Sequence, residues 1–206
     1  MNTNNIYEKR SICTIVLVLV NVAVFFFLTA KGMTEDAEFM LEHGAMYVPY
    51  VLQGEYQTIF TSMFLHFGFE HLMNNMLILA LIGWNLELEI GKIKFLLIYF
   101  LSGIAGNVLS AWMELQAGDF AVSAGASGAI FGLIGAAFYV AIRNKGQFGE
   151  ISGRGLLFMI VVSLYYGFTS EGVDNFAHIG GLLAGFVLAV LLYWKRKQKT
   201  SSDIWS

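Results

Sequence analysis

The fold of this chain is decided by the stretch SAGASGAIFG (residues 123–132), which sets Ser127 among very small residues at the start of a long apolar segment. Its counterpart is AHIGG (residues 177–181), which places His178 near the start of the last apolar segment. Glycines let two helix backbones approach closely, so a histidine on one helix can reach a serine hydroxyl on its neighbour. A serine beside a histidine is the arrangement of a nucleophile and its base. The two stretches therefore predict that Ser127 and His178 meet.

The composition places most of the chain in a membrane. Apolar types make up 57 % of the 206 residues, charged types make up 13 %, and there is a single proline. A soluble domain of this size could not bury so many apolar side chains, so several long uncharged runs should lie in lipid. The expected fold class is all-α, a polytopic bundle of six transmembrane helices. Charges and glycines place these helices at about residues 11–30, 70–86, 93–112, 123–142, 155–168 and 176–194.

The remaining segments divide the chain simply. Residues 1–10 are expected to be a cytoplasmic N-terminus, residues 11–195 a membrane domain, and residues 196–206 a cytoplasmic tail. Within the membrane domain, residues 31–57 carry many acidic side chains and are predicted to form a structured outer loop. The basic flank before residues 11–30 could belong to a signal peptide, but the run is long and ends in a poor cleavage site, which favours a retained helix.

Lysine and arginine predict the orientation. With a cytoplasmic N-terminus, Lys31 is the only basic residue left outside. The cytoplasmic side receives Lys9, Arg10, Lys92, Lys94, Arg143, Lys145, Arg154, Lys195, Arg196, Lys197 and Lys199. This is the positive-inside distribution. We expect a multi-pass protein of a cell membrane with its N-terminus in the cytoplasm, and favour a bacterial inner membrane over a eukaryotic organelle.

In this orientation, polar side chains from three helices come to one depth near the outer surface. They are Ser127, His178, His71 and Asn75. A polar side chain within a span is costly and marks a candidate site. Asp174 is expected in the outer loop, so the sequence predicts a Ser127–His178 dyad without a carboxylate, in which neutral His178 accepts the serine proton. His71 and Asn75 are an i, i+4 pair on one helix face and could donate hydrogen bonds to a developing oxyanion.

Plainer interpretations apply to other residues. His66 is expected to be structural, tying the loop to the second helix, and Glu87 to hold the cytoplasmic ends of the second and third helices by hydrogen bonds. Asn74 and Asn107 are expected to bond between helices. No metal site is expected, because His66 and His71 are five residues apart and face different ways, and no cofactor is expected.

Small residues admit a second interpretation. Ordinary packing of small residues between helices, without catalysis, would explain their spacing as well. The residues concerned are Gly128, Gly132, Gly135, Gly181 and Gly185.

Four motifs follow one another in the predicted helices. They are His-x-x-x-Asn at residues 71–75, Gly-x-x-x-Glu-x-x-x-Gly at residues 83–91, Gly-x-Ser-x at residues 125–128 and Ala-His-x-x-Gly-x-x-x-Gly at residues 177–185. Any one of them is a weak pattern, but all four in this order are specific. Over residues 60–185 the chain resembles the rhomboid family of intramembrane serine proteases.

The resemblance implies a role for each candidate residue. It makes Ser127 the nucleophile and His178 the general base and acid, and it puts His71 and Asn75 in the oxyanion hole. The implied substrates are transmembrane proteins that are cut near the outer face. The implied partners are these proteins and the lipid bilayer, and no nucleic acid is expected. The segment 168–175 resembles the cap that admits water and substrate. Natural substrate and oligomeric state stay open.

The chain departs from the family pattern in two places. Many relatives have Trp-Arg where this chain has Tyr56-Gln57, and some have tyrosine at the position of Phe131, whose ring can still stack on His178. Two rival functions remain. A catalytically silent rhomboid-like protein that escorts membrane clients is disfavoured because both Ser127 and His178 are present. A small transporter is disfavoured because no charge lies in the middle of a predicted span.

Overall fold

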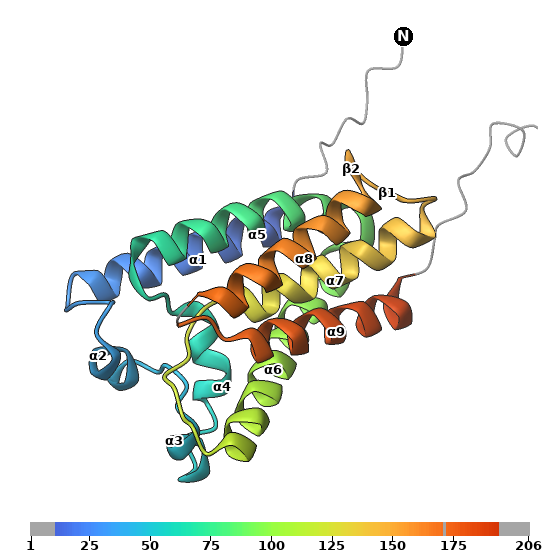
Figure 1. Cartoon of the computed structure of the whole chain (residues 1–206). Coiled ribbons are helices and arrows are strands. Elements are labelled where there is room, and N and C mark those ends of the chain that lie inside the picture. The colour runs from blue at the N-terminus through green and yellow to red at the C-terminus, as the bar shows by residue number, and fades with distance from the viewer. Residues whose placement is uncertain (1–10, 171, 194–206) are drawn as a thin grey trace, which may run out of the picture.

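The computed structural model describes residues 11–170 and 172–193 and is mainly helical (Figure 1). Six long helices occur where the sequence predicts them: α1 (Ile12–Thr29), α5 (Gly68–Ile90), α6 (Lys92–Ala117), α7 (Ser127–Arg143), α8 (Gly153–Thr169) and α9 (Asn175–Leu192). The expected cytoplasmic ends, residues 1–10 and 196–206, lie outside the described residues. A short hairpin of β1 (Gln147–Phe148) and β2 (Ile151–Ser152), which the sequence did not indicate, joins α7 to α8.

Length and composition identify fewer crossing helices than the six that were expected. In the described part of the chain, α1, α6 and α9 are long and apolar enough to cross a membrane. The helix α5 qualifies only together with α4 (Thr58–Thr61) and η1 (Ser62–Phe64), from which it is bent by 89°. The apolar helices α7 and α8 have 17 residues each, fewer than the roughly 20 that usually span a bilayer core.

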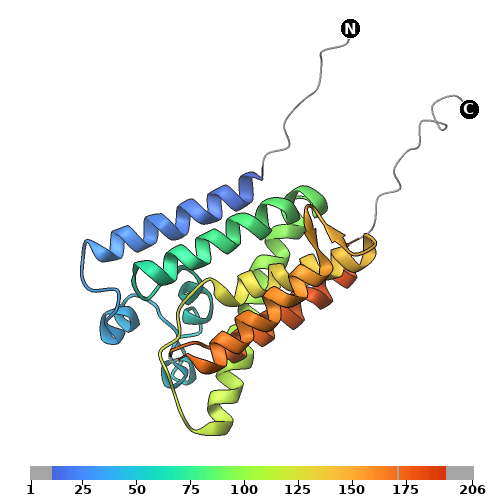
Figure 2. The same ribbon diagram turned by 45° about the horizontal axis from the view of Figure 1, so that its top comes forward.

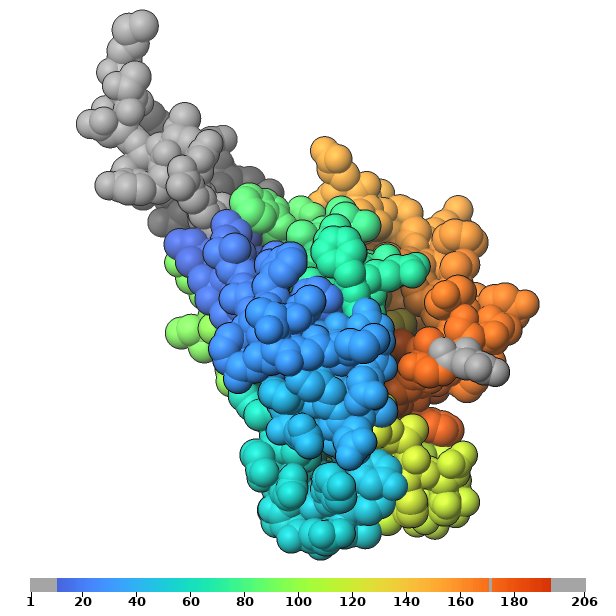
Figure 3. Space-filling view, turned by 90° about the vertical axis from the view of Figure 1, so that its left-hand side faces the viewer, coloured from blue at the N-terminus to red at the C-terminus, as the bar shows by residue number. Residues whose placement is uncertain are grey.

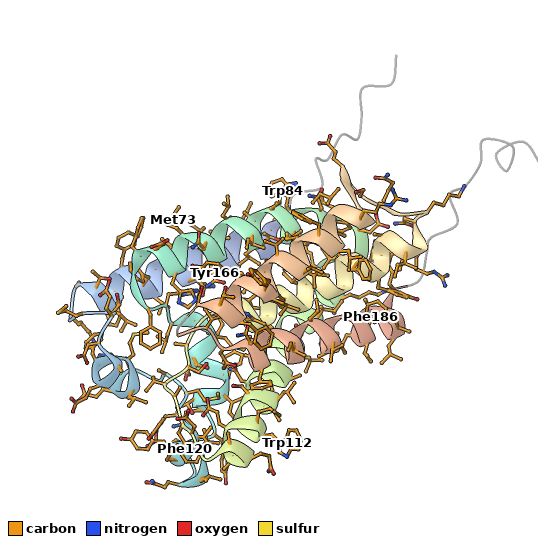
Figure 4. The ribbon with its side chains drawn as sticks, in the orientation of Figure 1. Met73, Trp84, Trp112, Phe120, Tyr166 and Phe186 are labelled. Atoms are coloured by element: carbon orange, nitrogen blue, oxygen red, sulfur yellow. The ribbon has the colours of Figure 1, made fainter. Side chains whose placement is uncertain are left out.

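The outsides of the long helices are apolar. Met73 and Trp84 on α5, Trp112 on α6 and Tyr166 on α8 all project away from the bundle (Figure 4), and each is exposed. Large apolar side chains in such numbers on a protein surface indicate a surface that water does not cover. The helical bundle is therefore built to face lipid.

The loop between α1 and α5 is structured, as the sequence predicts. It contains α2 (Ala37–Glu42) and α3 (Val48–Leu52) as well as α4 and η1, and it forms a lobe beside the end of α6 (Figures 1 and 3). Asp36 caps α2, and Pro49 lies in the first turn of α3, where its missing N–H costs nothing. Asn107 of α6 donates from Nδ2 to the carbonyl oxygen of Ile59 at 2.7 Å and to Ser62 Oγ at 3.0 Å. The interhelical role predicted for Asn107 is thus confirmed.

Glu87 fastens the first two long helices together. Near the end of α5, its carboxylate accepts hydrogen bonds from the backbone N–H groups of Cys13 and Thr14 at 2.9 and 2.8 Å, and from Thr14 Oγ1 at 2.9 Å. The first turn of a helix has N–H groups without intrahelical partners, and a carboxylate satisfies them well. The prediction that Glu87 joins the second helix to the third was wrong, because the open N–H groups belong to α1.

The other helix ends on this side also meet. Lys94 Nζ donates to the carbonyl oxygen of Leu192 at 2.7 Å, joining the start of α6 to the end of α9. Tyr193 OH donates to Glu89 Oε1 at 2.7 Å, and Asn144 Nδ2 donates to the same oxygen at 3.3 Å. The starts of α1 and α6 and the ends of α5, α7 and α9 therefore form one end of the bundle.

The centre of the bundle is the contact between α7 and α9. Figure 2 shows α7 running alongside α8 and α9, and it is α9 that α7 contacts most extensively. A Cβ added at Gly185 would overlap the carbonyl oxygen of Gly132, and one added at Gly181 would overlap that of Gly128. The backbones of the two helices therefore touch, which confirms the close packing predicted from the glycines.

Replacing Gly185 by alanine should destabilise the bundle, because α9 must move away from the Gly132 carbonyl group. We expect a loss of about 1–3 kcal/mol in the free energy of unfolding, seen as a lower midpoint in thermal unfolding of the detergent-solubilised chain. Gly153→Ala is the matched control, since the atom nearest to its new Cβ would lie 3.6 Å away. Equal midpoints for the two variants would contradict the close contact of α7 and α9.

Candidate active site

The four residues before α7 are not helical, whereas the sequence predicted a helix from residue 123. Ser123 forms an antiparallel bridge with Met46, with N–H···O bonds of 2.9 and 2.8 Å. Gly125 donates its N–H to the carbonyl oxygen of Ser62 at 2.9 Å and has a φ of +146°, which favours glycine. These bonds to the outer loop draw the backbone away from the helix, so Ser127 becomes the first residue of α7.

Ser127 and His178 lie at the same level of two touching helices. A Cβ added at Gly128 would be 3.4 Å from the carbonyl oxygen of Ala177, and these contacting residues are the sequence neighbours of Ser127 and His178. The His178 side chain is only 8 % exposed. Its ring stacks on that of Phe131, with centroids 4.2 Å apart and planes at 12°, as the sequence suggested.

The serine and the histidine are neighbours without being hydrogen-bonded. Among the described residues, no hydrogen bond joins Ser127 to His178, and Nδ1 of His178 is buried without a partner. Bonds between catalytic groups are often long or misaligned in unliganded enzymes and tighten when substrate binds. The arrangement therefore suits a dyad that closes on substrate.

Gly125 brings His71 to the same place. A Cβ added at Gly125 would lie 3.0 Å from His71 Nε2 and 3.6 Å from Ser127 Oγ. The imidazole edge and the serine hydroxyl thus border the space that the absent side chain leaves open. Any larger residue at position 125 would fill it.

Asn75 adds a second polar group on the same face of α5, one turn after His71. Its side chain is 6 % exposed, and within the described residues its Nδ2 atom is buried without a hydrogen-bond partner. A buried amide donor without a partner costs about 1–3 kcal/mol, and it is available to an oxygen that enters the site. Asn74, by contrast, is exposed and makes no hydrogen bond in the part of the chain that is described, so its predicted interhelical bond was wrong.

His66 contacts both the residue before Ser127 and the ring of His71. It is 1 % exposed, and its Nε2 accepts a hydrogen bond from the Ala126 N–H at 3.5 Å. Its ring meets that of His71 edge-on, with centroids 5.2 Å apart. It therefore contacts both α5, as the sequence predicted, and the segment that leads to Ser127.

Asp174 is the residue whose role the sequence analysis missed. It lies at the end of the outer loop, directly before α9, and caps this helix by accepting the Ala177 N–H on Oδ1 at 2.9 Å. Its Oδ2 accepts the hydroxyls of Ser110 and Ser123 at 2.7 and 2.9 Å. An aspartate directly before an apolar helical run is an N-cap signal, and this pattern could have identified it.

The arrangement is suited to acyl transfer. A nucleophile at a helix start has unpaired backbone N–H groups and the positive end of the helix dipole beside it. A histidine near Ser127 can take its proton, while a second histidine and an amide can bind an oxyanion. In the described ranges, no three His, Cys, Asp or Glu side chains are grouped so as to hold a metal ion.

Comparisons with known proteins point in the same direction. A family profile described as "Rhomboid domain" matches residues 53–195. The chain is 36 % identical over 179 residues to "Rhomboid protease GluP" of Bacillus subtilis (strain 168), which covers 87 % of this chain and 34 % of that protein. It is 33 % identical over 149 residues to "Putative rhomboid protease YdcA" of the same organism, covering 72 % and 73 % of the two chains.

A plant relative extends the comparison. The chain is 40 % identical over 151 residues to "RHOMBOID-like protein 5" of Arabidopsis thaliana, covering 72 % of this chain and 48 % of the relative. The chain thus spans between about a third and a half of the length of GluP and of this plant protein. The range that the family profile matches, residues 53–195, contains all four motifs and every candidate site residue. The chain belongs to the rhomboid family.

Proposed function

We propose that this chain is an intramembrane serine endopeptidase that hydrolyses peptide bonds in or near transmembrane segments of other membrane proteins. The observation that carries the proposal is the Gly128–Ala177 contact, which sets Ser127 and His178 at one level of two touching helices. Two of the relatives are named as proteases, which supports the same activity. The family and the apolar helices make the chain a multi-pass membrane protein.

Each proposed residue has a defined step. His178 accepts the hydroxyl proton as Ser127 Oγ attacks the substrate carbonyl carbon. His71, Asn75 and the Ser127 N–H bind the oxyanion that develops. The tetrahedral intermediate then collapses, the C–N bond breaks, and His178 gives the proton to the departing amine. Water repeats the sequence on the acyl-enzyme and regenerates Ser127.

The substrate is proposed to be a helix that unwinds locally. A carbonyl group inside a helix is hydrogen-bonded and shielded, and exposing backbone in lipid costs several kcal/mol for each unsatisfied group. A segment with small or helix-breaking residues near the outer face lowers this cost. The segment 168–175, of which residue 171 lies outside the described part, is proposed as the cap over the site.

The proposed topology has six spans, with the N-terminus and the C-terminus both in the cytoplasm of a bacterial cell. The end of the bundle at which Glu87 and Lys94 bond α1 and α9 holds the basic termini of α6, α7 and α8. A 17-residue helix at about 1.5 Å per residue covers most of a bilayer core. The non-helical residues 123–126 can complete the crossing of α7, because their backbone is bonded to protein.

Cleavage of a membrane-spanning reporter tests the dyad. The reporter carries a small residue near its outer end and is reconstituted with the chain in liposomes. We expect Ser127→Ala and His178→Ala each to abolish cleavage, since one removes the nucleophile and the other its base. Both variants must keep the wild-type unfolding midpoint. Cleavage that survives Ser127→Ala would overturn the mechanism, while reporter binding without any cleavage by the wild type would favour an escort protein.

Replacing Asn75 by alanine should slow cleavage with little change in KM, because an oxyanion donor acts mainly in the transition state. We expect kcat to fall about 10²- to 10³-fold. The neighbouring exposed residue supplies the matched control, and Asn74→Ala should cleave at the wild-type rate. A similar kcat for both alanine variants would remove Asn75 from the oxyanion hole.

Thiol labelling tests the topology. Cys13 is the only cysteine, so Cys13→Ser gives a background for single-cysteine variants. Met33 in the outer loop is 70 % exposed, and Lys145 after α7 is also exposed. A membrane-impermeant maleimide should label Met33→Cys on intact cells and Lys145→Cys only after permeabilisation. The reverse pattern would contradict the orientation, and labelling of both on intact cells would contradict the span count.

A further inference from the structure

We propose that Asp174 is a positioning residue that holds the proposed nucleophile and its base in register across α7 and α9. The inference rests on the proposed protease function and deepens it. Asp174 touches neither Ser127 nor His178 through its carboxylate. It bonds instead to the segments that carry them.

The first connection runs along α9. Oδ1 of Asp174 accepts the N–H of Ala177, the residue immediately before His178, and the Asp174 carbonyl oxygen accepts the N–H of His178 at 3.2 Å. The Ala177 N–H belongs to the first helical turn and has no partner within the helix, whereas the bond to the His178 N–H is the first regular bond of the helix. The cap therefore sets the start of the helix and, through it, the place of His178.

The second connection leaves α9. Oδ2 accepts the hydroxyl of Ser123 at 2.9 Å, four residues before Ser127, and the hydroxyl of Ser110 on α6 at 2.7 Å. The other bonds of residues 123–126 go to Met46, Ser62 and His66, which all lie in the outer loop. Among the described residues, Ser123 to Asp174 is the only hydrogen bond that ties this segment to α9.

The α7–α9 contact combines glycine backbones with aromatic pairs, in which Phe131 stacks on His178 and both Phe138 and Tyr139 meet Phe186. None of these contacts involves residues 123–126, so they do not hold the segment that leads to Ser127. A misplacement of about 1 Å between catalytic groups can cost roughly 100-fold in rate. A carboxylate can accept three hydrogen bonds on its two oxygens. Asp174 can therefore connect three segments, namely α6, residues 123–126 and α9.

Variants of Asp174 separate the cap from the bridge. Asp174→Ser keeps a good N-cap but is too short to reach both serine hydroxyls. Asp174→Asn keeps the cap and can donate from its amide to those hydroxyls, and it removes the charge. The double variant Ser110→Ala/Ser123→Ala leaves Asp174 and its cap in place and removes only the bridge.

The test measures reporter cleavage and the rate at which a fluorophosphonate labels Ser127 in the detergent-solubilised full chain, with Ser127→Ala as the blank. We expect labelling rate and kcat to fall at least about tenfold in Asp174→Ser and in the double serine variant, as for a displaced catalytic group. KM should stay within about twofold, because only the dyad geometry changes. Asp174→Ser leaves the buried Ser110 hydroxyl without its acceptor and should lower the unfolding midpoint. Rates are therefore measured at a temperature at which every variant is fully folded, and Asp174→Asn should keep most of the rate.

Three results would overturn the inference. The first is wild-type labelling in Asp174→Ser, and the second is an equal rate loss in Asp174→Asn, which would assign the effect to charge. The third is a rate loss seen only at temperatures at which the variant is partly unfolded, which would assign it to stability. If the wild-type chain shows no labelling above the Ser127→Ala blank, the proposed function itself fails and this inference fails with it.

Discussion

The contact of two helix backbones at glycines is the constraint on which the rest of this structure depends. Lipid gives helices no hydrophobic reason to associate, so close van der Waals packing must supply the attraction. Here the carbonyl oxygen of Gly132 on α7 lies against Gly185 on α9. The helix α6 approaches α9 at Gly106, where an added Cβ would lie 2.5 Å from the carbonyl oxygen of Ala177. Three helices therefore converge near the start of α9, which is the level of the candidate site.

The second constraint is the pairing of polar groups that the bundle buries. Some of these groups are bonded: Glu87 to the open N–H groups of α1, and Asn107 to the outer loop. Others away from the site, such as Asn21 Oδ1 and Glu114 Oε2, have no hydrogen-bond partner in the described structure. At the site, the Nδ2 atom of Asn75 and the Nδ1 atom of His178 are buried without partners in the described structure. Such groups each cost about 1–3 kcal/mol, and those at the site leave hydrogen-bonding positions open to a molecule that enters it.

The sequence was sufficient for features that depend on local pattern. Long apolar runs gave the six helices, and the glycine spacing gave the α7–α9 contact, because both follow from what one segment can do in lipid. Features that depend on a distant partner were missed or wrong. The non-helical form of residues 123–126 requires Met46 and Ser62, and the partner of Glu87 is α1, which is 73 residues away in sequence. The number of spans was also not settled by pattern, since α7 and α8 are short.

The same distinction explains what family membership does and does not determine. Motifs identify which side chains can be present at a site, and here they select Ser127, His178, His71 and Asn75. Catalysis requires a finer condition, since a proton moves only between groups at hydrogen-bond distance, and Ser127 is not bonded to His178 in this structure. Under the proposed function, the distance between Ser127 and His178 would depend on groups outside these motifs, such as the Asp174 carboxylate, which bonds to the segments that carry them.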